Sequence, residues 1–319
     1  MKDNIIYLPE FNEQAILGNL GKIIFTCSEK EARKLLNFDN FSVIFDFDGT
    51  LSRGLDRKEL TDVLNQIESK TGKTIDKEDI LSNHPSDEKT QKIYSGWGAI
   101  EWLLSKESRR ECRANFEKYG KDVSEPNANF LALKLATGNV EKYRQEKLKR
   151  EHIHIAINSI PLRSGWTTVK EYFNELNGEE SKIKLAALTY GFKYALSRTE
   201  FAGVFDNIYG CELNFKPDGT VQGVSLDVTP ITKKDKVEEF GIFCNDAKII
   251  AIGDSMHDKY MFQASDVSVF LAHHLMAKED NYSSAPNLLE LYNMSDVIIP
   301  YDTLHPVKDF LELVHHKSF

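Results

Sequence analysis

The sequence has no long hydrophobic run of the kind that crosses a membrane. No stretch approaches the ~18–20 apolar residues that a transmembrane helix needs. The chain starts with Met1-Lys2-Asp3-Asn4, without the basic segment and apolar core of a secretory signal, and we expect no such signal. A membrane partner is therefore not expected.

Cysteine is scarce as well, with 4 in 319 residues, and the four lie far apart. No two of them form a C-x-x-C pair, and the pattern fits neither a structural zinc site nor a disulfide scaffold. Free thiols in a reducing compartment explain them, so we expect a cytoplasmic protein.

An excess of basic residues is also lacking. Lys and Arg total 40 against 49 Asp and Glu, which gives a formal net charge of −9. This balance argues against a nucleic-acid partner or an anionic membrane surface. Hydrophobic residues make up 41% and charged residues 28%, as in ordinary globular proteins. At roughly 150 residues per domain, the length suggests about two domains.

Short apolar segments, each ended by a polar residue or a glycine, predict buried β-strands. They are residues 42–46, 183–189, 248–253, 267–271 and 296–300. Helical patterns such as 167–176 and 235–240 lie between them. Strands that alternate with helices predict an α/β fold, a doubly wound Rossmann-like parallel sheet.

The segment between the first two predicted strands is far longer than a crossover needs. Its apolar residues recur at helical spacing over 58–70, 97–118 and 139–157. We interpret residues 54–160 as an inserted, mostly α-helical domain. The core would then comprise 41–53 and 161–319, with residues 1–40 as an extension packed on or near it. A strand pair is expected within 206–228, around the turn signal Pro217-Asp218-Gly219.

The strongest chemical signal follows the first strand, where Asp46 and Asp48 precede Gly49 and Thr50. Open α/β sheets bind ligands at the carboxyl ends of their strands. Alternation along an extended chain points the two carboxylates the same way. A bound cation or a shared proton must relieve their repulsion, and Mg²⁺ is the natural oxygen-ligated ion. The alternative is a polar Asx-type turn.

A second strand ends in Gly253-Asp254, and Asp258 follows one helical turn later. An Asp at a helix start is a common structural use. Beside the first motif, however, the two acids complete a set of four carboxylates that would be costly without a cation.

Two weaker signals are a hydroxyl and a lysine cluster. Thr189 ends the second predicted strand, although a threonine there is more often a helix cap. Thr232 and Asp235 fit a capped helix start, which would hold Lys233 or Lys234 near a helix N-terminus. The alternative is a solvated lysine face.

In their order along the chain, these four signals resemble the haloacid dehalogenase-like (HAD) hydrolase superfamily. The resemblance covers about residues 41–53 and 161–300. It implies that Asp46 is a nucleophile that forms an aspartyl-phosphate, and that Asp48 is the general acid and base. Thr189 and one lysine would hold the phosphoryl group, with Lys233 favoured over Lys234 by the spacing of the apolar residues that follow.

The same resemblance implies a Mg²⁺ site built from Asp46, the main-chain carbonyl of Asp48, and Asp254, with Asp258 orienting the ion or its waters. Gly49, Thr50, Tyr190 and Gly191, next to these motifs, are expected to bind substrate. The acid at Asp48 favours phosphomonoester hydrolysis over carbon–halogen cleavage.

The insertion resembles the C1-type cap of the phosphoserine phosphatase-like and pyrimidine 5′-nucleotidase-like branches. It implies a small phosphorylated metabolite, a nucleotide monophosphate or a phosphoserine-like compound. Two alternatives stay open: a non-catalytic HAD-like binding module, and a phosphotransferase that uses the same aspartyl-phosphate.

The predicted insertion also carries aromatic and basic residues. Core packing is the simpler interpretation for Trp97 and Trp102. A solvated helix face is the simpler interpretation for Arg109, Arg110 and Arg113. The alternative is a binding role, because arginine and aromatic groups also bind bases and carboxylates. His152 and His154 are expected on different faces of a helix.

Overall fold

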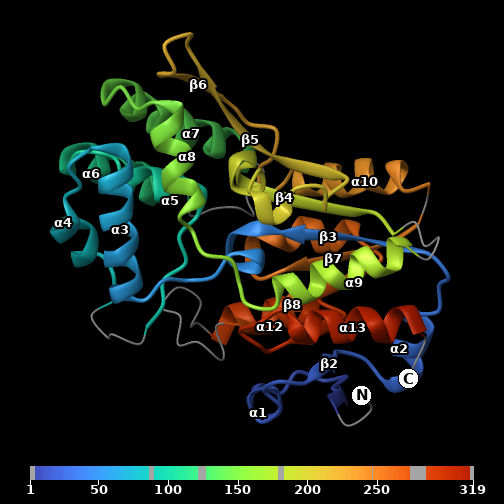
Figure 1. The fold of residues 1–319 in the computed structure, drawn as a ribbon. Helices are drawn as coiled ribbons and strands as arrows, with labels where there is room; N and C mark the ends of the chain where they lie inside the picture. The colour runs from blue at the N-terminus through green and yellow to red at the C-terminus, as the bar shows by residue number, and fades with distance from the viewer. Residues whose placement is uncertain are drawn as a thin grey trace.

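The computed structural model describes residues 4–85, 90–120, 127–178, 183–245, 247–273 and 285–316. Within these ranges the fold is built on a mixed sheet of nine strands (Figure 1). The strand order is β1-β2-β9-β8-β7-β3-β4-β5-β6. The six central strands, from β9 to β5, run parallel. The strands are β1 (Ile5–Tyr7), β2 (Ile23–Phe25), β3 (Phe41–Asp46), β4 (Leu185–Phe192), β5 (Asn207–Phe215), β6 (Val221–Ser225), β7 (Lys248–Gly253), β8 (Val267–Leu271) and β9 (Val297–Ile299).

Helices cover both faces of the sheet, because the side chains of a strand point alternately to either side. Phe45 on β3 packs with Trp166 of α9 (Trp166–Gly178), in the hydrophobic cluster that also includes α13 (His305–His316). Ile44 belongs to a second cluster with α10 (Lys233–Phe243), α11 (Lys259–Ala264) and α12 (Ala285–Met294). The predicted doubly wound α/β core is confirmed.

The first 40 residues add two strands to one edge of this sheet. Strand β2 pairs antiparallel with β9, and β1 pairs parallel with β2. The short helices α1 (Glu13–Leu17) and α2 (Glu29–Leu35) connect these strands to each other and to β3. The sheet is therefore mixed, where the sequence patterns predict a parallel one.

Helices fill the long segment between β3 and β4, and most gather at the carboxyl end of β3 (Figure 1). Besides α9, they are α3 (Arg57–Thr71), α4 (Lys77–Ser82), α5 (Gly96–Glu101), α6 (Lys106–Tyr119), α7 (Ala128–Gln145) and α8 (Arg150–Asn158). In the described ranges, no helix has both the length and the apolar character needed to cross a bilayer.

Two of the segments with helical spacing are each divided between two helices in the structure. Residues 97–118 form two helices because Ser105, whose side chain accepts from the Ser108 N–H, caps a new start at α6. Residues 139–157 also divide, into α7 and α8. Lys147 between them has a φ of 51°, a left-handed conformation that no helix interior allows.

The predicted strand pair is present as β5 and β6, which project toward the helices α7 and α8 (Figure 1). The Arg150 N–H donates to the Gly219 carbonyl over 2.9 Å, and the Val221 N–H donates to the Leu148 carbonyl over 3.0 Å. This hairpin ties the sheet to the helical segment.

Candidate functional site

The predicted site residues come from three adjacent parallel strands. Strand β3 lies between β4 and β7 in the sheet. The chain continues from β3 to β4 on one side, and the later strand β7 pairs with the other side of β3. This is the switch point at which open α/β sheets bind ligands. Asp46, Thr189 and Asp254 therefore reach one edge of the sheet, although they lie far apart in sequence.

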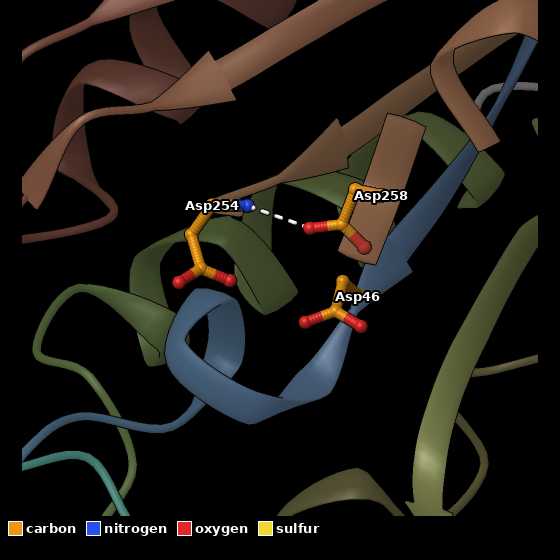
Figure 2. Close-up of side chains that lie close together, drawn as sticks. All are labelled: Asp46, Asp254 and Asp258. Carbon is orange, nitrogen blue, oxygen red and sulfur yellow. Dashed lines mark hydrogen bonds between the residues drawn. The ribbon is translucent and has the colours of Figure 1, made fainter. Parts of the chain in front are cut away.

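Three buried carboxylates converge at this edge, as Figure 2 shows for Asp46, Asp254 and Asp258. One ligand atom from each lies within 4.8 Å of the others. The Asp258 carboxylate accepts from the backbone N–H groups of Asp254, at 3.0 Å, and Ser255, at 3.1 Å. Buried carboxylate oxygens at this spacing suit a divalent cation with oxygen ligands. The Asp48 side chain is not in this cluster.

The turn after β3 is shaped to approach Asp254. Gly49 has a φ of 94°, and a Cβ there would lie 2.3 Å from Asp254 Oδ2. The Thr50 hydroxyl donates to Asp254 Oδ1 over 3.0 Å. Gly49 and Thr50 thus face the carboxylate cluster and are not among the described residues that line the neighbouring cavity.

Lys233 is the cation of this cluster. Its Nζ lies 2.5 Å from Asp46 Oδ1 and 2.6 Å from Asp258 Oδ1, and the side chain is buried. These two carboxylates raise the pKa of Lys233 despite its burial, so it stays charged. Lys234 instead lies on the exposed side of α10 and faces Glu238 at 3.7 Å, away from the site.

The predicted capped start of α10 does not form. Thr232 has helical backbone angles, and its side chain makes no cap hydrogen bond. Its Oγ1 accepts from the Thr229 N–H instead, over 2.8 Å. Lys233 is placed by the first turn of α10 and by its ion pairs.

The two acids of the first motif differ in environment. Burial, and then the Asp258 carboxylate, raise the pKa of Asp46 well above its ordinary value, and Lys233 opposes them. Burial raises the pKa of Asp48 to about 6, against the hydrogen bond from Thr189 and the positive charge of Lys233. The Asp48 Oδ1 atom is buried and has no hydrogen-bond partner among the described residues.

The end of β4 holds Asp48 in place. The Thr189 hydroxyl donates to Asp48 Oδ2 over 2.9 Å and accepts from the Gly191 N–H over 2.7 Å. A Cβ on Gly191 would lie 2.7 Å from Asp48 Oδ2, so only glycine fits here. The Tyr190 carbonyl accepts from the Trp97 indole over 3.2 Å, a bond between α5 and β4.

A cavity of about 500 Å³ opens between the sheet edge and the helices α5 to α7. Asp46, Asp48 and Lys233 line it on the side of the sheet, with Tyr190 and Gly191. The helical side of its wall is mainly apolar and aromatic, with a few charged groups: Ile80, Tyr94, Trp97, Glu101, Trp102, Arg109, Arg113, Phe116, Ala132 and Leu135.

The tryptophans and arginines of the helical segment have mixed roles. Trp102 is buried, and so is Arg109, which pairs with Asp79 at 3.1 Å. Arg113 is partly exposed and lies 3.7 Å from the same Asp79. Arg110 is exposed. Core packing thus describes Trp102, whereas a solvated face does not describe Arg109.

The histidines of α8 lie apart from the carboxylate cluster. His154 packs on Tyr194 with ring centroids 4.4 Å apart, and His152 faces Glu151. His257, to which the sequence assigns no role, lines the cavity. Burial, together with the Lys233 charge, lowers the pKa of His257.

Two residues at this edge were missed by sequence reasoning. The buried guanidinium of Arg163 donates to the carbonyls of Gly49, at 2.5 Å, and Thr50, at 3.2 Å. The buried His273 lies against Asp254. A signal existed for His273, because it closely follows a predicted strand whose carboxyl end reaches this edge. Arg163 lies outside any motif.

No protein-family model matches the chain, and no curated protein has a matching sequence. Among solved structures, the chain is similar to cytosolic 5′-nucleotidase IIIB bound to cytidine, with a TM-score of 0.57, 14% identity and 91% of each chain covered. A probable phosphoserine phosphatase from Vibrio cholerae matches with a TM-score of 0.53 and 13% identity, over 89% of this chain and 68% of the other. A phosphoserine phosphatase in apo form matches with a TM-score of 0.50 and 15% identity, over 86% of this chain and 99% of the other.

These similarities establish the fold of the chain. The chain shares the fold of these structures, a Rossmann-like core with a helical cap. At such low identity the fold alone is shared, and the activity has to be argued from the site.

Proposed function

We propose that the protein is a Mg²⁺-dependent phosphomonoester hydrolase that works through an aspartyl-phosphate on Asp46. One observation carries this proposal. Asp46 forms a cluster with Lys233, Asp254 and Asp258, and Asp46, Asp48 and Lys233 line a cavity large enough for a small organic phosphate.

The proposed domain division follows the sequence analysis, with residues 54–160 as the cap on a core of 41–53 and 161–319. The two connections between these parts run side by side, which supports boundaries here. The Arg53 N–H donates to the Pro161 carbonyl over 3.1 Å, and the Arg163 N–H donates to the Leu51 carbonyl over 2.8 Å.

The residues present fit a divalent metal ion. Asp46, Asp254 and Asp258 place three oxygen ligands close together, and the single ammonium of Lys233 cannot neutralise them all. Asp46 and Asp254 would hold Mg²⁺ with the main-chain carbonyl of Asp48, and Asp258 would orient it. When bound, the ion would supply positive charge that lets an anionic carboxylate approach an anionic phosphate.

In the first proposed step an Asp46 oxygen attacks phosphorus and the ester P–O bond breaks. The leaving oxygen takes its proton from Asp48. In the second step the Asp48 carboxylate removes a proton from water, which attacks the same phosphorus, releases inorganic phosphate and restores Asp46. The unpartnered Oδ1 of Asp48 and its raised pKa, about 6, support both roles.

Lys233 and Thr189 support the phosphoryl group in this proposal. The Lys233 ammonium already lies 2.5 Å from Asp46 Oδ1, and a charge that is in place before the reaction costs no reorganisation. Thr189 holds Asp48 toward the cavity through a 2.9 Å hydrogen bond.

The cavity favours a nucleoside monophosphate over phosphoserine as substrate. Its volume of about 500 Å³ exceeds what the serine part of phosphoserine needs, and the partly exposed Tyr94 and Trp97 offer aromatic surface for a planar group. The similar 5′-nucleotidase structure is described as bound to cytidine. A cytoplasmic location is part of the proposal, supported by four unpaired cysteines.

A panel of phosphate esters, assayed with Mg²⁺ and with EDTA, tests the proposal. We expect release of inorganic phosphate by the wild type with Mg²⁺, and no release by Asp46→Asn. Absence of turnover across nucleotides, phosphoamino acids and aryl phosphates would favour the binding module. Transfer of phosphate to an added alcohol in place of water would indicate a phosphotransferase.

A further inference from the structure

His273 lies two residues beyond the end of β8, at the same edge of the sheet as the carboxylate cluster. Its side chain is fully buried, and its Nε2 lies 3.1 Å from Asp254 Oδ2. No motif of the sequence includes this residue, and the steps proposed above do not use it.

In the hydrogen bond between His273 and Asp254, the histidine is the donor. A carboxylate oxygen accepts hydrogen bonds, so the Nε2 atom of His273 carries the hydrogen and donates it to Asp254. The other oxygen, Oδ1, accepts from the Thr50 hydroxyl over 3.0 Å. Asp254 is therefore held on both oxygens, from the end of β8 and from the turn after β3.

The three carboxylates of the cluster are oriented by different means. Backbone N–H groups and the Lys233 ammonium hold Asp258, and the same ammonium holds Asp46. The described hydrogen bonds to the Asp254 carboxylate come from side chains alone, Thr50 and His273. A substitution at His273 can thus remove one of these two hydrogen bonds and leave the other, from Thr50, in place.

We propose that His273 is a positioning residue that aims the Asp254 carboxylate at the metal ion. The inference rests on the proposed metal-dependent function. Hydrogen bonds from behind a ligand fix its orientation before the ion binds, and loss of such a partner typically weakens metal affinity about 10–100-fold. His273 does not touch substrate.

Titration of Mg²⁺ into the full-length protein without substrate, followed by calorimetry, tests this role. For His273→Leu, which keeps apolar volume and removes the donor, we expect a dissociation constant about 10–100-fold higher. His273→Gln places an amide N–H at nearly the reach of Nε2, so it should retain most of the affinity. His154→Leu, which removes a half-buried imidazole on α8, is the matched control and should bind like the wild type.

Turnover supplies a second readout. The Mg²⁺ concentration for half-maximal activity should rise in His273→Leu, whereas kcat at saturating Mg²⁺ should stay close to that of the wild type. A purely structural role would lower the fraction of active protein, and hence kcat, without moving the Mg²⁺ dependence.

The inference is overturned if folded His273→Leu binds Mg²⁺ as tightly as the wild type, or if His273→Gln is as weak as His273→Leu. Should the leucine variant fail to fold, His273→Asn replaces it, because its shorter amide cannot reach Asp254 and should lose affinity that the glutamine variant keeps. A wild type that binds no Mg²⁺ would overturn the metal assignment as well, whereas equal affinities overturn the role of His273 alone.

Discussion

The ammonium group of Lys233 lies 2.5 Å from Asp46 Oδ1, although 187 residues separate the two along the chain. Both side chains are buried, and Lys233 also reaches Asp258 at 2.6 Å. A buried charge without its partner is costly, and removing one member of such a pair typically destabilises a protein by about 3–5 kcal/mol. This contact therefore matters for stability as well as for the proposed chemistry.

The two neighbouring lysines give a matched test of that contact. Lys233→Met should lower kcat/KM at least about 10²-fold, the usual cost of losing a preorganised group at a developing charge. Lys234→Met should leave kcat/KM unchanged, because Lys234 faces Glu238 on the exposed side of α10. Steady-state kinetics with saturating Mg²⁺ measures both, and equal losses in the two variants would contradict the assignment.

Asp48→Asn should separate the two proposed steps. The amide keeps an acceptor for the Thr189 hydroxyl but cannot exchange a proton, and loss of a general acid typically costs about 10²–10⁴-fold. The loss should be smaller for an aryl phosphate, whose leaving group needs no proton, and phosphate should then accumulate on Asp46. Rapid-quench labelling would detect that intermediate, and an undiminished turnover of alkyl phosphates would remove Asp48 from the mechanism.

The raised pKa of Asp48 predicts how stability depends on pH. Its folded value of about 6 lies above the ordinary 3.8, so between these values the native state binds more protons than the unfolded state. The free energy of unfolding therefore falls as pH rises through this window. Urea unfolding in EDTA measures this free energy. Between about pH 4 and about pH 6.5, the free energy of unfolding of the wild type should fall by about 2–3 kcal/mol more than that of Asp48→Asn.

The control for that measurement is Mg²⁺, whose positive charge should stabilise the wild type most at the higher pH. Parallel pH profiles for the wild type and Asp48→Asn would show that burial of this carboxyl does not cost stability.

Glu101 is one of two acidic residues, with Glu117, that line the helical side of the cavity, and burial raises the pKa of Glu101 to about 7. If it binds the part of the substrate remote from phosphate, Glu101→Gln should raise KM about 10-fold or more with little change in kcat, because a hydrogen bond to a charged group is lost. Glu107→Gln, at an exposed position in the first turn of α6, is the matched control. An unchanged KM across the nucleotide panel would exclude a specificity role for Glu101.

Much of the core could be predicted from apolar runs. The predicted strands at 248–253 and 267–271 coincide with β7 and β8, because strands buried on both faces need continuous apolar residues. The helical character of the cap was predicted, but the points where its helices are interrupted were not. Lys147 interrupts one helix and Ser105 starts another through backbone geometry that the spacing of apolar residues does not reveal. The two added edge strands, β1 and β2, were not predicted, although the equally short β9 was.

Local motifs by themselves determined which aspartates would stand at strand ends, since a run of buried residues ended by Asp46 or Gly253-Asp254 is readable from the chain alone. Only the tertiary structure decided between Lys233 and Lys234, because the orientation of α10 against the sheet buries one side chain and exposes the other. It alone joined His273 and Arg163 to the site. Contacts between residues this far apart in sequence depend on the register of parallel strands and on the packing of their connections, which no local pattern encodes.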